Sequence, residues 1–452
     1  MKAGAPTMAH LDWRRMVVVL ALVAAGFALT LRVFYPGVMT YDAWYVHSYI
    51  ADGHAGDWQS PVMTWLWALI DPIAPGAASM FLLIDALYWL AFAVFALAVV
   101  RRSLWLGIVT PFLALAPPAF VFAGVIWRDV LFAAAWLLAA ALAFAAAERR
   151  GMARLTAQAL ALGLVAFGML LRPNALFAGP VLAAYIIWPA RFALMRAAIL
   201  YVPMAIALYA IVPVVYYGLL GAKREHPLHA IFVFDLGGIS HFTGENQFPI
   251  AWTPDENTLV TERCYQPTEW NIYWTDERCA FVMKRLESEK VFGSAALSDA
   301  WRHAVMTHPI AYLQHRAAVT ATFLAGDNLA MWTFDIEHPG QTVFADNAWF
   351  MGLKAVHDAL KPTPLFRAGA WLLLCAAWCA LAWRRRATPE GAFVIGTAGS
   401  AVIYMATFFF VGVAADFRYA LWAVFAGLAG AVALALPAPA ANLSGVISAE
   451  RA

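Results

Sequence analysis

The sequence MVVVLALVAAGFALTLRVF at residues 16–34 decides the class of this fold, because it is long, apolar and nearly uncharged. A helix of roughly 20 apolar residues is long enough to cross a bilayer. The chain then turns polar at once and reads YPGVMTYD over residues 35–42. Asp42 is therefore predicted to lie just outside the hydrocarbon, where ionisable residues are costly and tend to be functional.

The composition of the whole chain agrees with this class. Of 452 residues, 63% are hydrophobic and 13% are charged, whereas soluble domains average about 45–50% apolar and about 25% charged residues. The net charge is +2, and no basic stripe with interleaved aromatic residues is present. We therefore predict an all-α polytopic membrane protein that binds no nucleic acid.

The arginines order the predicted spans, because short cytoplasmic loops collect Lys and Arg. Every arginine cluster falls on one side if the chain crosses the membrane ten times. The spans are predicted at 16–34, 78–100, 104–126, 129–147, 155–171, 175–190, 197–219, 366–383, 391–413 and 418–436. Two further apolar segments, 61–75 and 317–332, contain acidic residues and are predicted to lie in the outer interface or to re-enter it.

These spans divide the chain into four parts. They are an N-terminal transmembrane module at 1–219 with a first outer loop at 35–77, an extracytoplasmic region with interfacial helices at 220–365, C-terminal transmembrane helices at 366–436, and a disordered tail at 437–452. Two of the four cysteines, Cys264 and Cys279, lie in the extracytoplasmic region. A disulfide is predicted there if the compartment is oxidising. A metal pair is the weaker alternative, because no Cys-x-x-Cys or His-x-x-x-His spacing accompanies them.

Polar and aromatic side chains crowd the first outer loop. Four of them are spaced as one face of a short amphipathic helix. These four are Asp42, Tyr45, Tyr49 and Asp52, and Trp44, Asp57, Trp58 and Gln59 lie nearby. An acid among such groups at the lipid–water boundary suits an amphiphilic substrate. The structural alternative is a solvated face with interfacial aromatic residues.

Three arginines break the charge bias, because they stand in tight turns on the outer side. They are Arg128 beside Asp129, Arg172 shortly before Asn174, and Arg418 between Asp416 and Tyr419. Arginine presents a planar fork of donors that suits phosphate, so an anionic headgroup would explain all three. The alternative is local pairing of Arg128 with Asp129 and of Arg418 with Asp416.

Taken together, these motifs resemble those of the GT-C superfamily, polytopic glycosyltransferases that use lipid-linked sugar donors. The segment from Tyr35-Pro36-Gly37 to Asp42 resembles the first outer loop, where the family has its catalytic acid. The segments Trp127-Arg128-Asp129, Arg172-Pro173-Asn174 and Asp416-Phe417-Arg418-Tyr419 resemble turns of uncharacterised bacterial relatives. Many relatives carry an Asp-Glu pair where this sequence reads Asp42-Ala43. A second carboxylate would then come from Asp57 or Asp129, or be absent, which leaves a divalent metal as an open alternative.

The resemblance implies a GT-C-like bundle of about ten transmembrane helices in the bacterial cytoplasmic membrane, with the active site facing the periplasm. It implies an inverting glycosyltransferase of the cell envelope that moves a sugar from a polyprenyl-phosphate donor to a glycan, lipid or protein acceptor. Asp42 is expected to be the catalytic base. The donor phosphate is expected to bind Arg128, Arg172 and Arg418, and the sugar or acceptor to bind Trp44, Tyr45, Asp57, Trp58, Gln59, Asp129, Asn174 and Tyr419.

The prenyl tail of such a donor is expected to contact the apolar segments 61–75 or 317–332. A transporter or flippase for a lipid-linked saccharide is the main alternative function. It would need a polar pathway across the bilayer, whereas the polar groups here crowd one face. This asymmetry favours an enzyme that works at one membrane surface.

Overall fold

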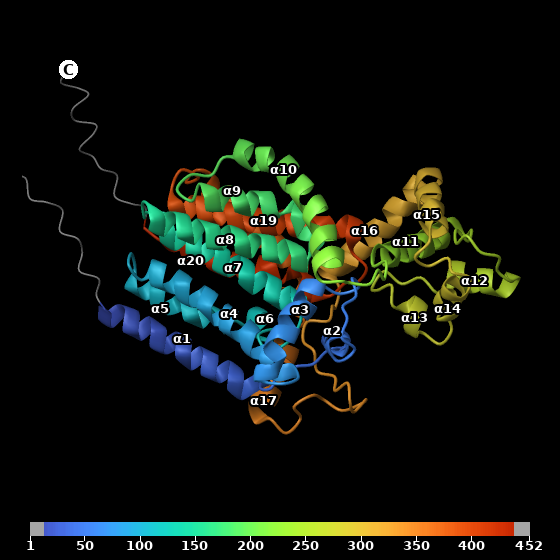
Figure 1. The fold of residues 1–452 in the computed structure, drawn as a ribbon, viewed down its shortest axis with the longest axis horizontal. Coiled ribbons are helices and arrows are strands. Elements are labelled where there is room, and N and C mark those ends of the chain that lie inside the picture. Colours follow the sequence, from blue (N-terminus) through green and yellow to red (C-terminus); the bar gives the residue numbers. More distant parts are fainter. Residues whose placement is uncertain (1–12, 438–452) are drawn as a thin grey trace, which may run out of the picture.

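The computed structural model describes residues 13–437, so the tail predicted at 437–452 lies outside the described residues except for Pro437. Within the described range the secondary structure is helical, and strand pairing is limited to isolated bridges. Figure 1 shows a bundle of long helices with a smaller group of short helices at one end. The predicted all-α fold is confirmed.

Seven helices of the described chain are long and apolar enough to cross a membrane. They are α1 (Trp13–Phe34), α4 (Ala77–Val99), α7 (Arg128–Ala146), α8 (Met152–Leu171), α10 (Leu194–Pro213) continued by the π-helix η3 (Val214–Leu219), α19 (Pro389–Val411), and the 3-10 helix η5 (Phe417–Ala420) continued by α20 (Leu421–Ala435). Each coincides with a predicted span, and the chain is an integral membrane protein.

The other three predicted spans are shorter or broken. The segment 104–126 forms α5 (Leu104–Leu113) and α6 (Pro117–Phe120), and the segment 175–190 forms the end of the 3-10 helix η2 (Pro173–Phe177) and α9 (Gly179–Ile187). The segment 366–383 forms α18 (Ala368–Trp383), which follows the 3-10 helix η4 (Pro364–Phe366). Prolines explain the breaks in the segments 104–126 and 175–190, because proline has no backbone N–H to donate to the preceding turn.

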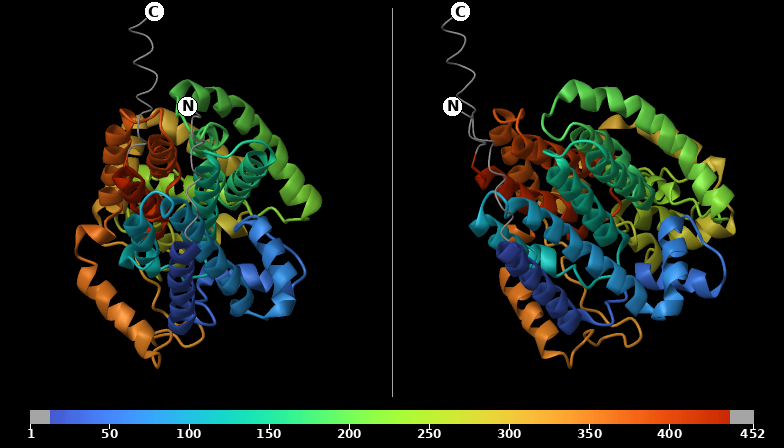
Figure 2. Two further views of the ribbon diagram at one scale, coloured as in Figure 1. Left: turned by 90° about the vertical axis from the view of Figure 1, so that its left-hand side faces the viewer. Right: turned by 60° about the vertical axis from the view of Figure 1, so that its left-hand side comes forward.

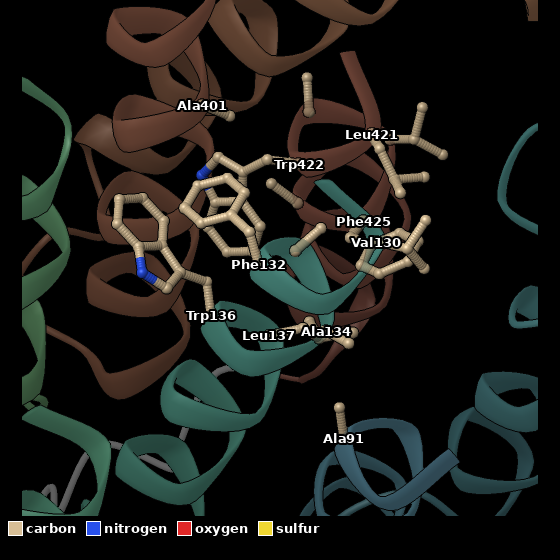
Figure 3. Packing of buried hydrophobic residues seen from close by; sticks show 14 of the residues in the cluster. Ala91, Val130, Phe132, Ala134, Trp136, Leu137, Ala401, Leu421, Trp422 and Phe425 are labelled. Atoms are coloured by element: carbon tan, nitrogen blue, oxygen red, sulfur yellow. The ribbon is translucent and has the colours of Figure 1, made fainter. Parts of the chain in front are cut away.

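Helix α7 forms the centre of the bundle, and 89% of the residues in its most apolar 18-residue stretch are buried. Its side chains Phe132 and Trp136 pack toward Trp422 of α20 (Figure 3), and the rings of Trp136 and Trp422 meet edge to face at 5.5 Å. The indole N–H of Trp422 donates to Ser400 of α19 at 3.0 Å. Alanine fills much of the rest of α7, and small residues allow helices in a membrane to approach closely.

Helix α10 contrasts with α7, because only 6% of the residues in the most apolar 18-residue stretch of α10 and η3 are buried. It arches over the bundle and stands at its margin in both views of Figure 2. Ile199, Val202 and Ile206 are exposed along it. An apolar surface of this kind suits contact with lipid tails, which are as apolar as the side chains themselves.

The arginine loops meet at one end of the bundle, where α1 begins and α20 ends (Figure 1). Arg102 forms ion pairs with both Glu148 and Glu390. The amide of Phe192 donates to the carbonyl of Arg386 at 2.8 Å, and Arg385 donates to the carbonyl of Leu434 at 3.0 Å. The loops that the arginines were predicted to bring to one side are therefore joined by direct contacts.

The helices at the opposite end of the bundle (Figure 1) are here called the extramembrane region, after their predicted position. They are α11 (Leu228–Thr243), α12 (Pro254–Glu262), α13 (Ile272–Thr275), α14 (Phe281–Ser288), α15 (Ala295–Thr307) and α16 (Pro309–Ala325). They share a hydrophobic core of their own, and the predicted disulfide between Cys264 and Cys279 is present in it. Closing a loop of about 15 residues contributes about 3 kcal/mol in the chain-entropy model.

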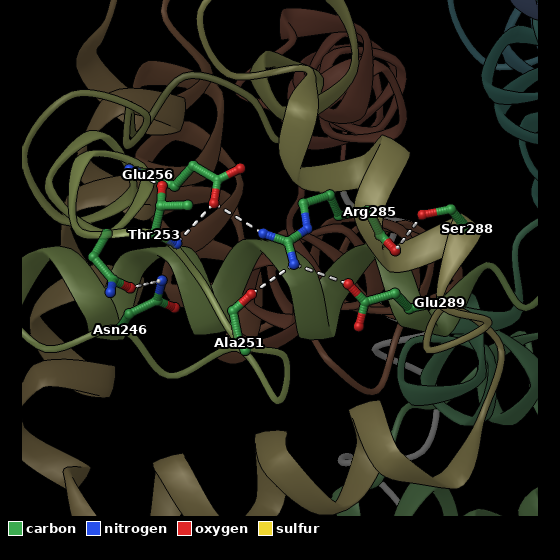
Figure 4. A network of polar contacts seen from close by, with 8 residues as sticks. Asn246, Ala251, Thr253, Glu256, Arg285, Ser288 and Glu289 are labelled. Atoms are coloured by element: carbon green, nitrogen blue, oxygen red, sulfur yellow. Dashed lines mark hydrogen bonds and ion pairs between the residues drawn. The ribbon is translucent and has the colours of Figure 1, made fainter.

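A polar network on the surface ties the short helices of this region together (Figure 4). Thr253 and Glu256 form a capping box at the start of α12. Arg285 of α14 donates to Glu256 at 2.9 Å and to the carbonyl of Ala251 at 2.6 Å. Arg285 thus holds α14 against the N-terminal end of α12.

The remaining helices flank the outer end of the bundle. They are α2 (Tyr41–Ala51), α3 (Pro61–Ile70), the 3-10 helix η1 (Asp71–Ile73) and α17 (Ala348–Leu360). The short helix predicted after the first span is α2, and Thr40 caps it by accepting the amide N–H of Ala43 at 3.2 Å. The second predicted interfacial segment, 317–332, is the end of α16 followed by irregular chain, because the helix stops at Gly326.

Candidate active site

A cavity of about 730 Å³ lies at the end of the bundle opposite the arginine loops, between the transmembrane helices and the extramembrane region. Asp42, Arg128, Arg172 and Arg418 all line it. These residues come from α2, the start of α7, the end of α8 and η5, which are far apart in the sequence. The tertiary structure therefore brings the predicted base and all three predicted phosphate-binding arginines to a single hollow.

Asp42 is held at the start of α2 with its carboxylate open to the cavity. Its Oδ2 accepts from Arg418 Nη1 at 2.6 Å, and its Oδ1 accepts from Gln59 Nε2 at 3.2 Å. The side chain is 39% exposed, because the cavity leaves one side of it uncovered. Burial acts to raise the pKa of the Asp42 carboxyl, but Arg418 and Arg128 outweigh burial and hold this pKa below its usual value.

Arg418 connects two carboxylates. Besides Asp42, its Nε lies 3.1 Å from Asp416 Oδ2, and its guanidinium lies 4.4 Å from the centre of the Trp127 ring. Burial raises the pKa of Asp416; the guanidinium of Arg418 opposes this effect, and the charge of Asp42 adds to it. The predicted local pair of Arg418 with Asp416 is confirmed, but the same arginine also binds the candidate base.

Arg172 pairs with Asp129 rather than standing alone. Both side chains are nearly buried, and the Arg172 guanidinium lies 5.0 Å from the Tyr419 ring. The alternative that Arg128 pairs locally with Asp129 does not hold, because Arg172, distant in the sequence, binds that carboxylate. Asn174 lines the cavity and donates to Thr407 at 3.3 Å.

Arg128 differs from the other two arginines. In the part of the chain that the structure describes, its side chain forms no ion pair and no hydrogen bond, although it lines the cavity. It is the first residue of α7, and the N-terminal end of a helix carries partial positive charge that favours anions. Of the three predicted phosphate-binding arginines, Arg128 is therefore the most available to an anion; a fourth arginine of the lining, Arg224, lies over the Tyr217 ring at 3.9 Å.

The other predicted binding residues divide into two groups. Asp57, Trp58, Gln59, Asn174 and Tyr419 line the cavity. Trp44, Tyr45 and Asp129 do not belong to its lining. Trp44 is exposed on α2, and Asp129 is occupied by Arg172.

Tyr45 belongs to a network around Glu225, which sequence reasoning missed. The Glu225 carboxylate accepts from the hydroxyls of Tyr45 at 3.0 Å and Tyr49 at 2.6 Å, and from the amide of Trp58 at 3.0 Å. Asp57 in turn accepts the amide N–H of Glu225 at 2.6 Å. The tyrosine spacing on α2 was visible in the sequence, but no signal indicated its partner so far along the chain.

The extramembrane region supplies a further part of the lining that the sequence did not indicate. Glu269, Trp270 and Asn271 lie within the loop that the disulfide closes, whereas His226 precedes α11 and His229 lies in its first turn. The rings of Trp270 and Trp58 are 5.6 Å apart. No motif marks these residues, because they reach the cavity only through the packing of the extramembrane region on the bundle.

One wall of the cavity is apolar. It consists of Leu171, Phe177, Val212, Phe408 and Val411, which belong to α8, η2, α10 and α19. The segments 61–75 and 317–332, predicted to contact a prenyl tail, do not contribute to the lining. The apolar surface of the cavity is thus provided by the bundle helices themselves.

The carboxylates expected to complete a metal site are engaged elsewhere. Asp129 binds Arg172, and Asp57 accepts from the amide of Glu225 and from Tyr217. Within residues 13–437, no three His, Cys, Asp or Glu side chains are grouped so that they could hold a metal ion. The residues present do not fit the metal site that the resemblance leaves open, and no step below is assigned to a metal.

Comparisons with known proteins give one similarity of overall structure. No protein-family model and no curated protein matches the chain. The crystal structure of the Archaeoglobus fulgidus oligosaccharyltransferase, tethered by a disulfide to an acceptor peptide with an NVT sequon, is similar at a TM-score of 0.37 and 13% identity. The match covers 92% of this chain and 49% of that one, so this chain spans about half the length of the archaeal enzyme. At this TM-score the similarity says nothing about the chemistry of the cavity, which is inferred below from its own residues.

Proposed function

We propose that this protein is an inverting glycosyltransferase of the bacterial cytoplasmic membrane. It would transfer a sugar from a polyprenyl-phosphate donor to an acceptor at the periplasmic face. The observation that carries the proposal is the convergence of Asp42, Arg128, Arg172 and Arg418 on one cavity. A proton acceptor beside several guanidinium groups matches the two charges that such a transfer develops, a proton on the acceptor and an anion on the leaving group.

Asp42 is assigned as the general base. Its pKa lies below the usual value, so the carboxylate is ionised at neutral pH. The acceptor hydroxyl gives its proton to Asp42 as its oxygen bonds to the anomeric carbon. The bond from that carbon to the phosphate oxygen breaks on the opposite side, the electron pair leaves with polyprenyl phosphate, and the configuration inverts.

Arg128 is assigned as the main ligand of the leaving phosphate. Arg172 is neutralised by Asp129, and Arg418 is shared between Asp42 and Asp416. Arg128 has no such partner among the described residues, so its five donors are available to phosphate oxygens. The attraction between a guanidinium group and a phosphate is stronger in a partly desolvated cavity than in water.

The apolar wall suits the prenyl chain of the donor. Val212 of α10 and Phe408 of α19 lie on this wall, and the exposed face of α10 continues it toward the lipid. A donor could keep its tail in the bilayer while its phosphate reaches Arg128. This arrangement replaces the expected contacts with 61–75 and 317–332.

The proposal is tested in proteoliposomes with a panel of labelled polyprenyl-phosphate sugars. Asp42→Asn keeps the size of the side chain and its contact with Gln59 but removes the base. We expect turnover to fall by about 10²–10⁴-fold, the usual contribution of a general base. Asp52→Asn, at the exposed C-terminal end of the same helix, is the matched control and should leave turnover unchanged.

Near wild-type turnover by Asp42→Asn would remove Asp42 as the base. Movement of the labelled lipid across the vesicle membrane without release of its sugar would instead favour the alternative of a transporter or flippase. The two outcomes are separated by following sugar transfer and lipid position in the same vesicles.

A further inference from the structure

An acid, a histidine and an arginine form a completely buried cluster in the extramembrane region, away from the cavity lining. They are Asp235 of α11 and His315 and Arg316 of α16, each 0% exposed. Asp235 Oδ1 lies 2.7 Å from Arg316 Nη2 and 3.1 Å from His315 Nε2. The catalytic scheme above uses none of them.

The cluster is closed by two aromatic side chains. Trp301 of α15 donates its indole N–H to Asp235 Oδ2 at 2.7 Å, and the Tyr265 hydroxyl lies 3.0 Å from His315 Nδ1. Buried ion pairs add little stability over well-packed apolar residues, because removing the charges from water is costly. The geometric consequence of this cluster is therefore more informative than its contribution to stability.

The second arm of Arg316 leaves the cluster and reaches the transmembrane bundle. Arg316 Nη1 donates to the carbonyl of Gly412 at 2.8 Å. Gly412 follows the last residue of α19 and begins the connecting segment 412–416, here called the strap. One guanidinium thus joins α11 of the extramembrane region to the strap.

The strap is also paired with the disulfide-closed loop. The amide of Trp270 donates to the carbonyl of Val413 at 2.9 Å, and the amide of Ala415 donates to the carbonyl of Thr268 at 2.7 Å. Val413 and Ala414 line the cavity. The strap therefore forms the junction between the extramembrane region and the cavity wall.

The strap ends at Asp416, which binds Arg418, which in turn binds Asp42. We propose that Arg316 is a positioning residue that fixes the strap and thereby sets the position of Arg418 relative to Asp42. The catalytic importance of this positioning rests on the proposed function. The position of the strap itself can be measured without any substrate.

The chemistry of arginine is needed for this role. Its planar fork presents separate donors to Asp235 and to the Gly412 carbonyl at the same time, whereas the ammonium group of lysine is a single compact charge. Arg316→Lys should therefore keep a charge beside Asp235 and lose the bond to the strap. Arg316→Met removes both.

The first test is hydrogen exchange of the full-length protein in lipid nanodiscs, without substrate. In Arg316→Lys and Arg316→Met, the amides of Ala415 and Phe417 should exchange faster than in the wild type, while those of α7 stay protected. Arg302→Lys is the control, because Arg302 is an exposed residue of α15 whose ion pair among the described residues is with Asp299. Unchanged exchange at both amides in Arg316→Lys would overturn the proposal. Should Arg316→Met fail to fold, Arg316→Lys carries the test.

The second test is binding of a polyprenyl phosphate to the same nanodiscs. We expect Arg316→Lys to bind about tenfold more weakly, a size typical of coupling between two sites, with the folded fraction unchanged. A variant that lost only folded protein would lower the number of binding sites and keep Kd, which would overturn the positioning role. If the wild type itself bound no polyprenyl phosphate, the proposed function would fail, whereas the exchange measurement would still decide the role of Arg316.

Discussion

The two ends of the helical bundle both carry arginines, but they use them differently. At the loop end, Arg102 is held between Glu148 and Glu390, and Arg385 donates to backbone carbonyls near the end of α20. At the cavity end, Arg418 and Arg172 are paired with acids while Arg128 faces the cavity without a partner among the described residues. At the loop end acids and backbone carbonyls bind these two guanidinium groups, whereas at the cavity end the guanidinium of Arg128 is left available to a ligand.

The difference shows why positive charge alone does not identify a site. Arginines at the loop end follow the general bias of membrane proteins toward basic loops on one side, and their partners are structural. Arginines at the cavity end lie at the other end of the bundle, and they line a hollow of about 730 Å³. Substitution of arginines at the two ends should therefore affect different quantities, the stability of the fold at the loop end and ligand binding at the cavity end.

The largest effect is expected at the loop end. Arg102→Met leaves the Glu390 carboxylate buried at 0% exposure without its cation. Removing one partner of a buried pair costs about 3–5 kcal/mol, so thermal unfolding in detergent should occur at a clearly lower temperature. Donor binding per folded molecule should not change. Arg101→Met, on the exposed neighbour, is the control, and an equal loss of stability there would contradict the assignment.

A smaller effect of the opposite kind is expected at the cavity end. Arg128→Gln removes a charge that has no ion-pair partner in residues 13–437, so stability should stay nearly constant. A hydrogen bond to a charged group contributes about 1.5–3 kcal/mol, and donor affinity should fall by about tenfold or more. Titration with polyprenyl phosphate measures this affinity. Arg32→Gln, exposed in the last turn of α1, should bind normally; equal loss in both variants would indicate a general charge effect.

The smallest effect is a shift along the pH axis. Arg418 is the largest of the influences that lower the pKa of Asp42, so Arg418→Gln should raise this pKa. A base acts only when ionised, and activity falls as pH drops through its pKa. The acid limb of kcat/KM should therefore move to higher pH in Arg418→Gln. An acid limb at the wild-type pH would show that Asp42 is not the group that titrates.

Much of the fold could be predicted from the sequence. Long apolar runs predicted seven of the spans where helices are found, because burial of backbone in lipid requires complete internal hydrogen bonding. The charge bias predicted that the arginine loops share one end of the bundle, and contacts such as the one between Arg102 and Glu148 agree with it. The breaks within two predicted spans were missed, because hydropathy counts apolar residues and gives no weight to a proline pair such as Pro117-Pro118.

The candidate site was only partly predictable. Asp42 and the three arginines were recognised from local motifs, and their convergence on one cavity agrees with that reasoning. Glu225 and Trp270 were missed, since their partners lie far away in the sequence. Asp129, expected to bind the sugar or acceptor, instead binds Arg172, a partner that local spacing did not indicate.

The sequence by itself determined the class of the protein, the grouping of its arginine loops at one end, the helix after the first span and the cysteine pair that forms the disulfide. These features depend on hydropathy, charge bias and spacing, which act locally along the chain. Only the tertiary structure decided which acid neutralises which arginine, and so that Arg128 remains available. Electrostatic attraction falls with distance, and in this fold the distances that matter join residues from different helices.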